Sequence, residues 1–429
     1  MEGNHAKTNR WLSQDLSALI VQQSQHHEIY DLVIVGSGYG GAMAAAELAG
    51  MKDGEGRTLK ICLLERGKEY LPGSFPSQMG ELPGHVRVST PMEKKPKGFG
   101  DGLFDVRIGP DVCALVASGL GGGSLINAGV MEIPKWGDFA DRLPADVLKY
   151  LQTADYAGIK QTLGAVNKAI EQHPRVGTAN PLDRTLALQA LDPGNFTLHD
   201  HLERPFKPAK LFRQAAVTIK MSAADEANLK QCTLCGDCMT GCNIGAKKSL
   251  DTNLLLRAHD QQVEIYTGAT VLKLTRERSP GMTDSLWQLH VVHSDEDCRK
   301  HQATPLPLRA RKVILAAGAL GSPEILLRSR NNKLQFSSRL GQQFSCNGDN
   351  IATYYKLHTP VNAVADENMP ISRASAASAP PLPACWMCLQ HRSAKAFCCR
   401  SLPSPARWRT CFLRWLPPPT PCMFCPPVI

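Results

Sequence analysis

The sequence predicts an α/β fold in which a Rossmann-like domain binds a dinucleotide, and two stretches carry this prediction. The apolar residues 32–35 lead into glycines 36, 38 and 41 and then into the alanine-rich residues 42–49. The apolar residues 313–317, after Lys312, lead in the same way into Gly318 and Gly321. A strand that passes through a glycine-rich turn into a helix is the first half of a βαβ unit, whose strands lie parallel.

The first glycine turn has the spacing of a phosphate-binding fingerprint. Gly36 permits the tight turn, Gly38 lets backbone approach a pyrophosphate, and Gly41 lets helix and strand pack closely. The helix that follows presents free N–H groups and a positive dipole end to an anion. Residues 32–50 hold Glu47 as their one charge, but the glycines at 36, 38, 40 and 41 argue against a membrane span.

A carboxylate follows at the end of the next predicted strand. Glu65 lies 24 residues beyond Gly41, where a Rossmann unit places the acidic residue that binds the adenosine ribose. A carboxylate accepts from a 2′-hydroxyl and repels a 2′-phosphate, which favours FAD or NAD over NADP. The alternative is a surface glutamate at a strand end.

Composition limits the remaining function classes. Residues 1–29 are a polar leader without a secretion signal, so a cytoplasmic location is expected. The net charge of +9 falls to +2 without residues 368–429, which hold seven basic and no acidic residues. The basic surplus therefore belongs to one segment, and we expect no nucleic-acid partner and no transmembrane segment.

That C-terminal segment, residues 366–429, matches no structural class. Its residues from 368 onward hold 12 of the 30 prolines and seven of the 15 cysteines. Such a density of proline blocks helix interiors and strand ladders. We interpret the segment as an aberrant Pro/Cys/Arg-rich tail, translated out of frame or replacing a lost C-terminal portion. A genuine Pro/Cys-rich appendage is the alternative.

A second glycine cluster is a further candidate site. Glycines 119, 121, 122 and 123 leave little side chain in the way of a flat ligand, and Ser124 and Asn127 supply hydrogen-bonding groups beyond them. A flexible surface loop is the alternative, but apolar residues flank the glycines on both sides.

Four cysteines form a C-x2-C-x2-C-x3-C run at Cys232, Cys235, Cys238 and Cys242. This spacing matches the run that ligates [4Fe–4S] clusters in bacterial ferredoxins, although Asn243 stands where those have proline. A [4Fe–4S] cluster, a zinc site and reduced structural thiols remain alternatives.

Taken together, these segments and residues 313–327 resemble the glucose–methanol–choline (GMC) flavoprotein oxidoreductases, in particular their cholesterol-oxidase-like branch. The resemblance covers about residues 30–365 and implies FAD as the cofactor. By position, Gly36, Gly38 and Gly41 would hold its pyrophosphate and Glu65 its ribose. The other implied contacts are Gly121, Gly122, Ser124 and Asn127 at the flavin, Val271 at the adenine, and Ala317 and Gly318 near the pyrophosphate.

The resemblance also implies a domain plan. FAD-binding residues 30–135 and 231–330, the latter with the cysteine cluster, enclose a helical substrate or cap region at 136–230. Residues 331–365 would start the sheet of the inserted substrate-binding domain, after which the C-terminal portion is missing or aberrant.

The activity implied is oxidation of the CH–OH group of a small-molecule alcohol, such as a sterol, by hydride transfer to flavin N5. In the family the catalytic residues come from the C-terminal portion, so no residue here is assigned a catalytic role and impaired turnover is expected. Two alternatives stay open. One is a non-catalytic flavin-binding remnant, and the other is a flavin and iron–sulfur dehydrogenase that passes electrons to an acceptor partner.

Overall fold

The computed structural model describes most of the N-terminal three-quarters of the chain. The described residues are 10–129 except 79, 94 and 111, then 218–220, 229–278 except 234 and 236, 285–345, and the strands at 349–352 and 395–398. Most of the predicted cap region at 136–230 and most of the tail at 366–429 lie outside these residues.

The predicted βαβ unit is present. Strand β2 (Ile29–Val35) leads through the first glycine turn into helix α2 (Tyr39–Leu48), and the chain returns as β3 (Ile61–Leu64). The two strands pair in parallel, with Leu32 opposite Ile61 and Val35 opposite Leu64. Apart from Asp31, both strands are apolar and almost wholly buried, as expected of strands covered on both faces.

A seven-stranded sheet extends from this unit in the order β1-β8-β3-β2-β11-β10-β9. Its other strands are β1 (Gln14–Asp15), β8 (Glu264–Thr267), β9 (Ala269–Arg278), β10 (Ser285–His293) and β11 (Leu306–Leu315). The first five strands in this order, β1, β8, β3, β2 and β11, pair in parallel. The last two, β10 and β9, pair antiparallel at one edge of the sheet. This mixed sheet confirms the α/β class.

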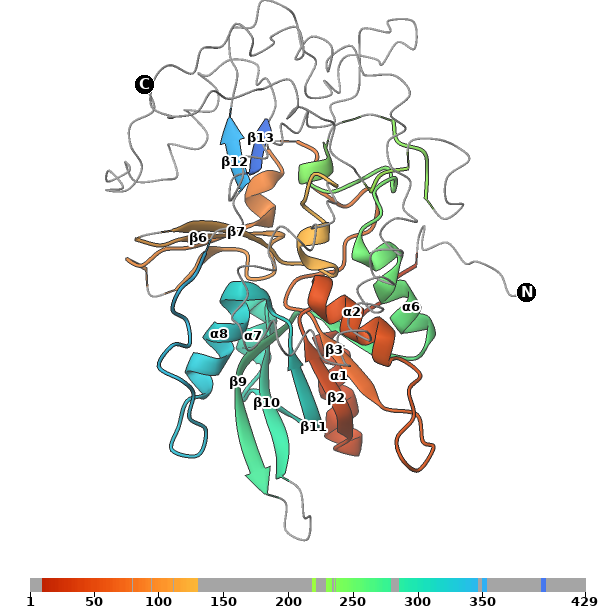
Figure 1. Cartoon of the computed structure of the whole chain (residues 1–429), viewed down its shortest axis with the longest axis vertical. Coiled ribbons are helices and arrows are strands. Elements are labelled where there is room, and N and C mark those ends of the chain that lie inside the picture. The colour runs from red at the N-terminus through yellow and green to blue at the C-terminus, as the bar shows by residue number, and fades with distance from the viewer. Residues whose placement is uncertain are drawn as a thin grey trace, which may run out of the picture.

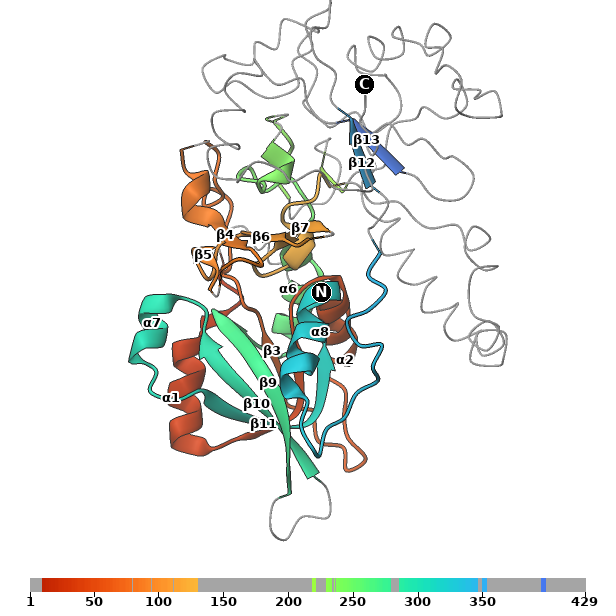
Figure 2. The same cartoon turned by 90° about the vertical axis from the view of Figure 1, so that its left-hand side faces the viewer.

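Helices cover both faces of the sheet. Helix α1 (Leu16–His26) packs on the face that carries Val33 and Val35, whereas α2 and α6 (Leu254–Asp260) pack on the face that carries Leu32 and Ile34. Figure 2 shows α1 and α2 on opposite sides of the sheet. Helix α8 (Gly318–Ser329) follows β11 and packs against β9, where Leu274 N–H donates to Ser329 Oγ over 2.8 Å.

The stretch read as a polar leader contributes to this domain. From residue 10 onward it forms β1, which pairs with β8, and α1, whose Leu16 and Leu19 are fully buried. Asp15 caps α1 by accepting from Ser17 N–H. The sequence did not reveal this role because polar stretches at residues 1–10 and 22–28 flank the short apolar run at residues 16–21.

A second, smaller sheet lies above the main one in Figure 1. Its order is β5-β4-β6-β7, formed by β4 (Val86–Ser89), β5 (Lys97–Gly98), β6 (Phe104–Ile108) and β7 (Cys113–Ala117). From sequence, residues 73–112 are expected to be loop-rich, because Pro, Gly and Lys recur through them. Its strands are short, and charged residues interrupt their apolar pattern.

The remaining elements are short. They are η1 (Leu82–His85), η2 (Gly122–Ser124), η7 (Asp237–Met239), η8 (Leu250–Thr252), α7 (Glu296–His301) and the parallel pair β12 (Asp349–Ala352) and β13 (Lys395–Cys398). Among the helices that the structure describes, none has the length and apolar character needed to cross a bilayer.

Candidate functional site

The candidate site lies where the glycine turns of the main sheet meet. At Gly36 the chain turns with φ +97°, and a Cβ built there would lie 2.5 Å from the carbonyl oxygen of Ala316. A Cβ on Gly41 would lie 1.9 Å from the Gly36 carbonyl oxygen. The β2–α2 turn therefore packs against the β11–α8 turn through backbone alone, and only glycine fits at these two positions.

The second glycine cluster closes onto the same place. A Cβ on Gly122, where φ is +53°, would lie 2.8 Å from the Cα of Gly38. Gly121 N–H donates to Ser37 Oγ over 3.0 Å, and Asn127 Nδ2 donates to the Tyr39 hydroxyl over 2.8 Å. The structure thus brings together the fingerprint and the Gly121–Asn127 segment, although 80 or more residues separate them in sequence.

Three glycines in this region leave open space where a side chain would stand. No neighbouring atom lies within 4 Å of a Cβ built on Gly38, Gly123 or Gly318. The N-caps of α2, η2 and α8 are Gly38, Gly121 and Ala317, and no side chain caps any of the three. The exposed N–H groups of the longer helices, α2 and α8, are suited to an anion such as a pyrophosphate.

Glu65 lies beside this space and is buried. Its Oε2 accepts from Ser37 N–H at 3.0 Å and from Ser37 Oγ at 2.6 Å, and its Oε1 accepts from Gly67 N–H at 2.9 Å. A carboxylate can accept about four hydrogen bonds, so one position remains for a ribose hydroxyl. The sequence missed Ser37, which occupies an unspecified position of the fingerprint and gave no signal.

Ser124 supports the second glycine segment from below. Its hydroxyl is buried, donates to the Gly121 carbonyl over 2.7 Å and accepts from Leu250 N–H over 3.1 Å.

Val271 lies in β9 opposite Val291. Two residues before it, Ala269 N–H donates to the Glu65 carbonyl over 2.8 Å, so Val271 is close to the ribose end of the site.

A buried lysine joins the second glycine segment to the cysteine run. Lys247 Nζ donates to the carbonyl oxygens of Leu125 at 2.7 Å, Asn127 at 2.9 Å and Cys238 at 2.7 Å. These three bonds use all its donors. Burial lowers the pKa of Lys247 to about 8 and raises the pKa of the Cys238 thiol to about 12, so Cys238 is a protonated thiol at neutral pH.

The four cysteines of the run are not gathered into a preformed metal site in the part of the chain that the structure describes. Among the described residues, no three of the sulfurs of Cys232, Cys235, Cys238 and Cys242 lie within 4.8 Å of one another. A tetrahedral zinc site needs sulfurs about 3.8 Å apart, given a Zn–S bond of about 2.3 Å. Asn243, which replaces the ferredoxin proline, instead accepts from Gly73 and Phe75 N–H and donates to the Phe75 carbonyl. Beyond the cysteine spacing, neither the family match nor the geometry of the described residues supports the [4Fe–4S] cluster.

A cluster of charged residues links the small sheet to the main domain. Asp105 of β6 is fully buried and pairs with Arg66 at 2.9 Å, Arg87 at 2.6 Å and Arg107 at 3.0 Å. Arg66 directly follows Glu65, and Arg107 also pairs with Glu324 of α8 at 3.0 Å. Burial opposes ionisation of Asp105, but the three guanidinium groups outweigh it and lower the pKa of the carboxyl below its usual value.

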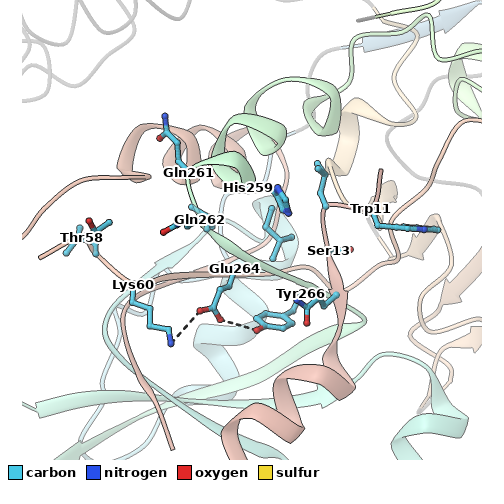
Figure 3. A pocket seen from close by; sticks show the side chains of 14 residues that line it. Trp11, Ser13, Thr58, Lys60, His259, Gln261, Gln262, Glu264 and Tyr266 are labelled. Carbon is cyan, nitrogen blue, oxygen red and sulfur yellow. Dashed lines mark hydrogen bonds and ion pairs between the residues drawn. The ribbon is translucent and has the colours of Figure 1, made fainter. Parts of the chain in front are cut away.

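A separate cavity of about 580 Å³ lies near the amino ends of β3 and β8, away from the glycine turns. Figure 3 shows Trp11 and Thr58 on opposite sides of it, with His259 between them. Below, Glu264 pairs with Lys60 at 3.5 Å and accepts from the Tyr266 hydroxyl at 3.0 Å. None of the predicted cofactor residues lines this cavity.

Comparison with known proteins defines the class. The sequence model of the family described as GMC oxidoreductase matches residues 30–346, about three-quarters of the chain. This protein therefore belongs to the GMC oxidoreductase family, whose members are FAD flavoproteins. The match includes the first glycine turn, the second glycine segment and the β11–α8 turn.

Individual relatives are distant. The chain is 26% identical over 331 residues to a cholesterol oxidase of Mycobacterium tuberculosis, covering 75% of this chain and 52% of that protein. It is 24% identical over 338 residues to a cholesterol oxidase of Acinetobacter baumannii, covering 75% and 55%. An (R)-mandelonitrile lyase-like protein of Arabidopsis thaliana is 27% identical over 304 residues, covering 70% and 45%. The chain spans about half the length of these relatives.

Among solved structures, a fungal aryl-alcohol oxidase aligns with a TM-score of 0.34 and 15% identity, covering 70% of this chain and 48% of that one. A formate oxidase aligns with a TM-score of 0.34 and 13% identity over the same shares.

Proposed function

We propose that this chain binds FAD at the meeting point of α2, η2 and α8 and belongs to an oxidoreductase acting on the CH–OH group of an alcohol. The observation that supports the proposal most is the backbone contact of Gly122 with Gly38, beside three glycines that leave open space. That arrangement, with uncapped α2 and α8, suits a long, flat and doubly anionic cofactor.

Different residues of the site would bind different parts of FAD. When bound, FAD accepts a hydride from an alcohol carbon. The first-turn N–H groups of α2 bind the pyrophosphate, which is why Gly38 carries no side chain. Glu65 accepts from the adenosine ribose, and the backbone of Val271 lies near the adenine. Gly121, Gly122 and Asn127 line the flavin, and Lys247 fixes Asn127 through its carbonyl.

The substrate class proposed is a sterol, supported by the cholesterol oxidases among the relatives. The test is anaerobic mixing of FAD-loaded protein with cholesterol, an aryl alcohol or a short alkyl alcohol, followed by the loss of oxidised-flavin absorbance. Bleaching by cholesterol alone supports the sterol, and bleaching by another alcohol corrects the substrate class.

Other outcomes decide between the remaining functions. Flavin that a chemical reductant reduces but no alcohol does would indicate a non-catalytic flavin-binding protein. Where an alcohol does reduce the flavin, oxygen consumption would indicate an oxidase, and reduction of a dye without oxygen consumption would indicate a dehydrogenase with an electron-acceptor partner. A protein that binds no FAD would contradict the proposal altogether.

A further inference from the structure

Three side chains with different ligand atoms converge where β10 ends and α7 begins. A ring nitrogen of His293, a carboxylate oxygen of Asp295 and the sulfur of Cys298 all lie within 4.8 Å of one another. We propose that they form a binding site for a zinc-class divalent cation. The site is separate from the glycine turns and independent of the proposed reaction.

The hydrogen bonds of His293 fix which ring nitrogen can bind the ion. Its Nδ1 lies 3.1 Å from the backbone nitrogen of Asp295, a group that can only donate, so the Nδ1 lone pair accepts this hydrogen bond and must exchange it for the ion. Its Nε2 lies 3.0 Å from Asp15 Oδ2 and therefore donates to that carboxylate. A histidine that ligates a metal commonly donates its other ring N–H to a carboxylate in this manner.

The imidazole is also held in place. The ring is buried, and a Cβ added to Gly268 would lie 3.2 Å from its Cε1 and Nε2, so a larger residue there would have to displace the ring by a few tenths of an ångström. Ser294 N–H donates to the Gly268 carbonyl over 2.8 Å, which anchors the chain directly after the histidine. A ligand held rigidly loses little entropy when it binds a metal.

Asp295 is placed to bridge the histidine and the cysteine. Its Oδ1 caps α7 by accepting from Cys298 N–H over 2.9 Å, which turns the carboxylate towards the first turn of that helix. Because a carboxylate offers about four lone-pair positions, Asp295 can keep this cap and coordinate an ion as well.

The ligand set selects the kind of ion. Imidazole nitrogen, carboxylate oxygen and thiolate sulfur suit zinc and its substitute cobalt, whereas magnesium and calcium prefer oxygen alone. Three protein ligands leave a fourth tetrahedral position for water. Tetrahedral ligand atoms lie roughly 3.3–3.8 Å apart, and the exposed Cys298 side chain can turn to close the remaining gap and gives the ion a path from solvent.

The first test is site-resolved alkylation of the full chain, read by peptide mass spectrometry with and without zinc. At zinc ten times above the dissociation constant, alkylation of Cys298 should slow about ten-fold. The rate at Cys113, another exposed free cysteine, should stay unchanged. Equal rates at Cys298 with and without zinc would overturn the site.

Variants then separate ligation from folding. Asp295→Asn keeps a good helix cap but removes the carboxylate, and should abolish the protection. Asp15→Asn keeps the cap of α1 but loses the carboxylate that accepts from His293, and should weaken zinc binding about 10–100-fold. Protection that survives Asp295→Asn unchanged would show that zinc acts elsewhere.

A second readout identifies the sulfur. Cobalt should produce a thiolate-to-metal charge-transfer band that Cys298→Ser reduces and that Cys113→Ser leaves intact. A band equally strong in both variants would assign the thiolate to other cysteines, such as the Cys232–Cys242 run, and would overturn the proposal. Neither Cys298→Ser nor Cys113→Ser changes the glycine turns, so FAD binding is measured on the same proteins. Loss of the metal site and loss of the proposed FAD site can therefore be told apart.

Discussion

Gly122 lies directly against Gly38, so close that a Cβ on Gly122 would come within 2.8 Å of the Gly38 Cα and 3.3 Å of its nitrogen. Gly38 is the N-cap of α2, and Gly122 begins η2. The contact places the second glycine segment directly beside the β2–α2 turn that carries the phosphate-binding fingerprint. It therefore explains why two glycine clusters far apart in sequence belong to one site.

Substitution of Gly122 should show whether its close contact with Gly38, rather than the flexibility of glycine in a loop, determines stability at this position. In Gly122→Ala the left-handed backbone costs about 1–2 kcal/mol and the clash with Gly38 about 1–3 kcal/mol, so we expect the free energy of unfolding to fall by about 2–5 kcal/mol. Urea unfolding measures it. Gly123→Ala is the matched control, because no neighbouring atom lies within 4 Å of its Cβ. Equal losses in both variants would contradict the packing described.

Glu65 should stabilise the turn before any ligand binds. Glu65→Gln replaces one accepting oxygen by an NH₂ group, which would face Ser37 or Gly67 donors. We expect a loss of about 1–3 kcal/mol in the free energy of unfolding without FAD, the usual cost of unpaired buried polar groups. Glu55→Gln, at an exposed position, should change stability by less than about 0.5 kcal/mol. A Glu65→Gln protein as stable as the wild type would show that these bonds contribute nothing.

Asp105 should behave as a buried counter-charge. Asp105→Asn leaves three guanidinium groups without their shared carboxylate, and we expect a loss of about 3–5 kcal/mol at pH 7. The exposed pair Glu93–Lys97 gives the control, since Glu93→Gln should cost no more than about 1 kcal/mol.

The same carboxyl should make stability depend on pH. Its pKa in the folded protein lies below the unfolded value of 3.8, so its contribution is present above about pH 4 and is lost as pH falls through the folded pKa. The difference between wild type and Asp105→Asn, measured by denaturant unfolding at several pH values, should therefore shrink below pH 4. A difference that stays constant down to pH 2 would contradict the low pKa.

The sequence was sufficient for the strand–turn–helix units and insufficient for what joins them. The runs at 32–35 and 313–317 are apolar and lead into glycine. Because such strands are buried on both faces, their pattern is distinctive. The small sheet was missed because β6 buries a charged residue, Asp105, and two of its arginine partners, Arg66 and Arg87, come from outside this strand. Contacts such as Ser37 with Glu65 depend on the turn geometry, and no spacing rule encodes them.

FAD titration of the wild type and Gly38→Ala tests the central claim most directly. Gly38 has φ −64° and ψ −170°, which alanine can adopt, and its Cβ would meet no atom within 4 Å. We therefore predict unfolding free energies within about 0.5 kcal/mol of each other. The wild type should bind one FAD per chain, and the variant should bind at least about ten-fold more weakly, since its methyl group occupies the pyrophosphate position. Equal FAD affinity in two equally stable proteins would contradict the site.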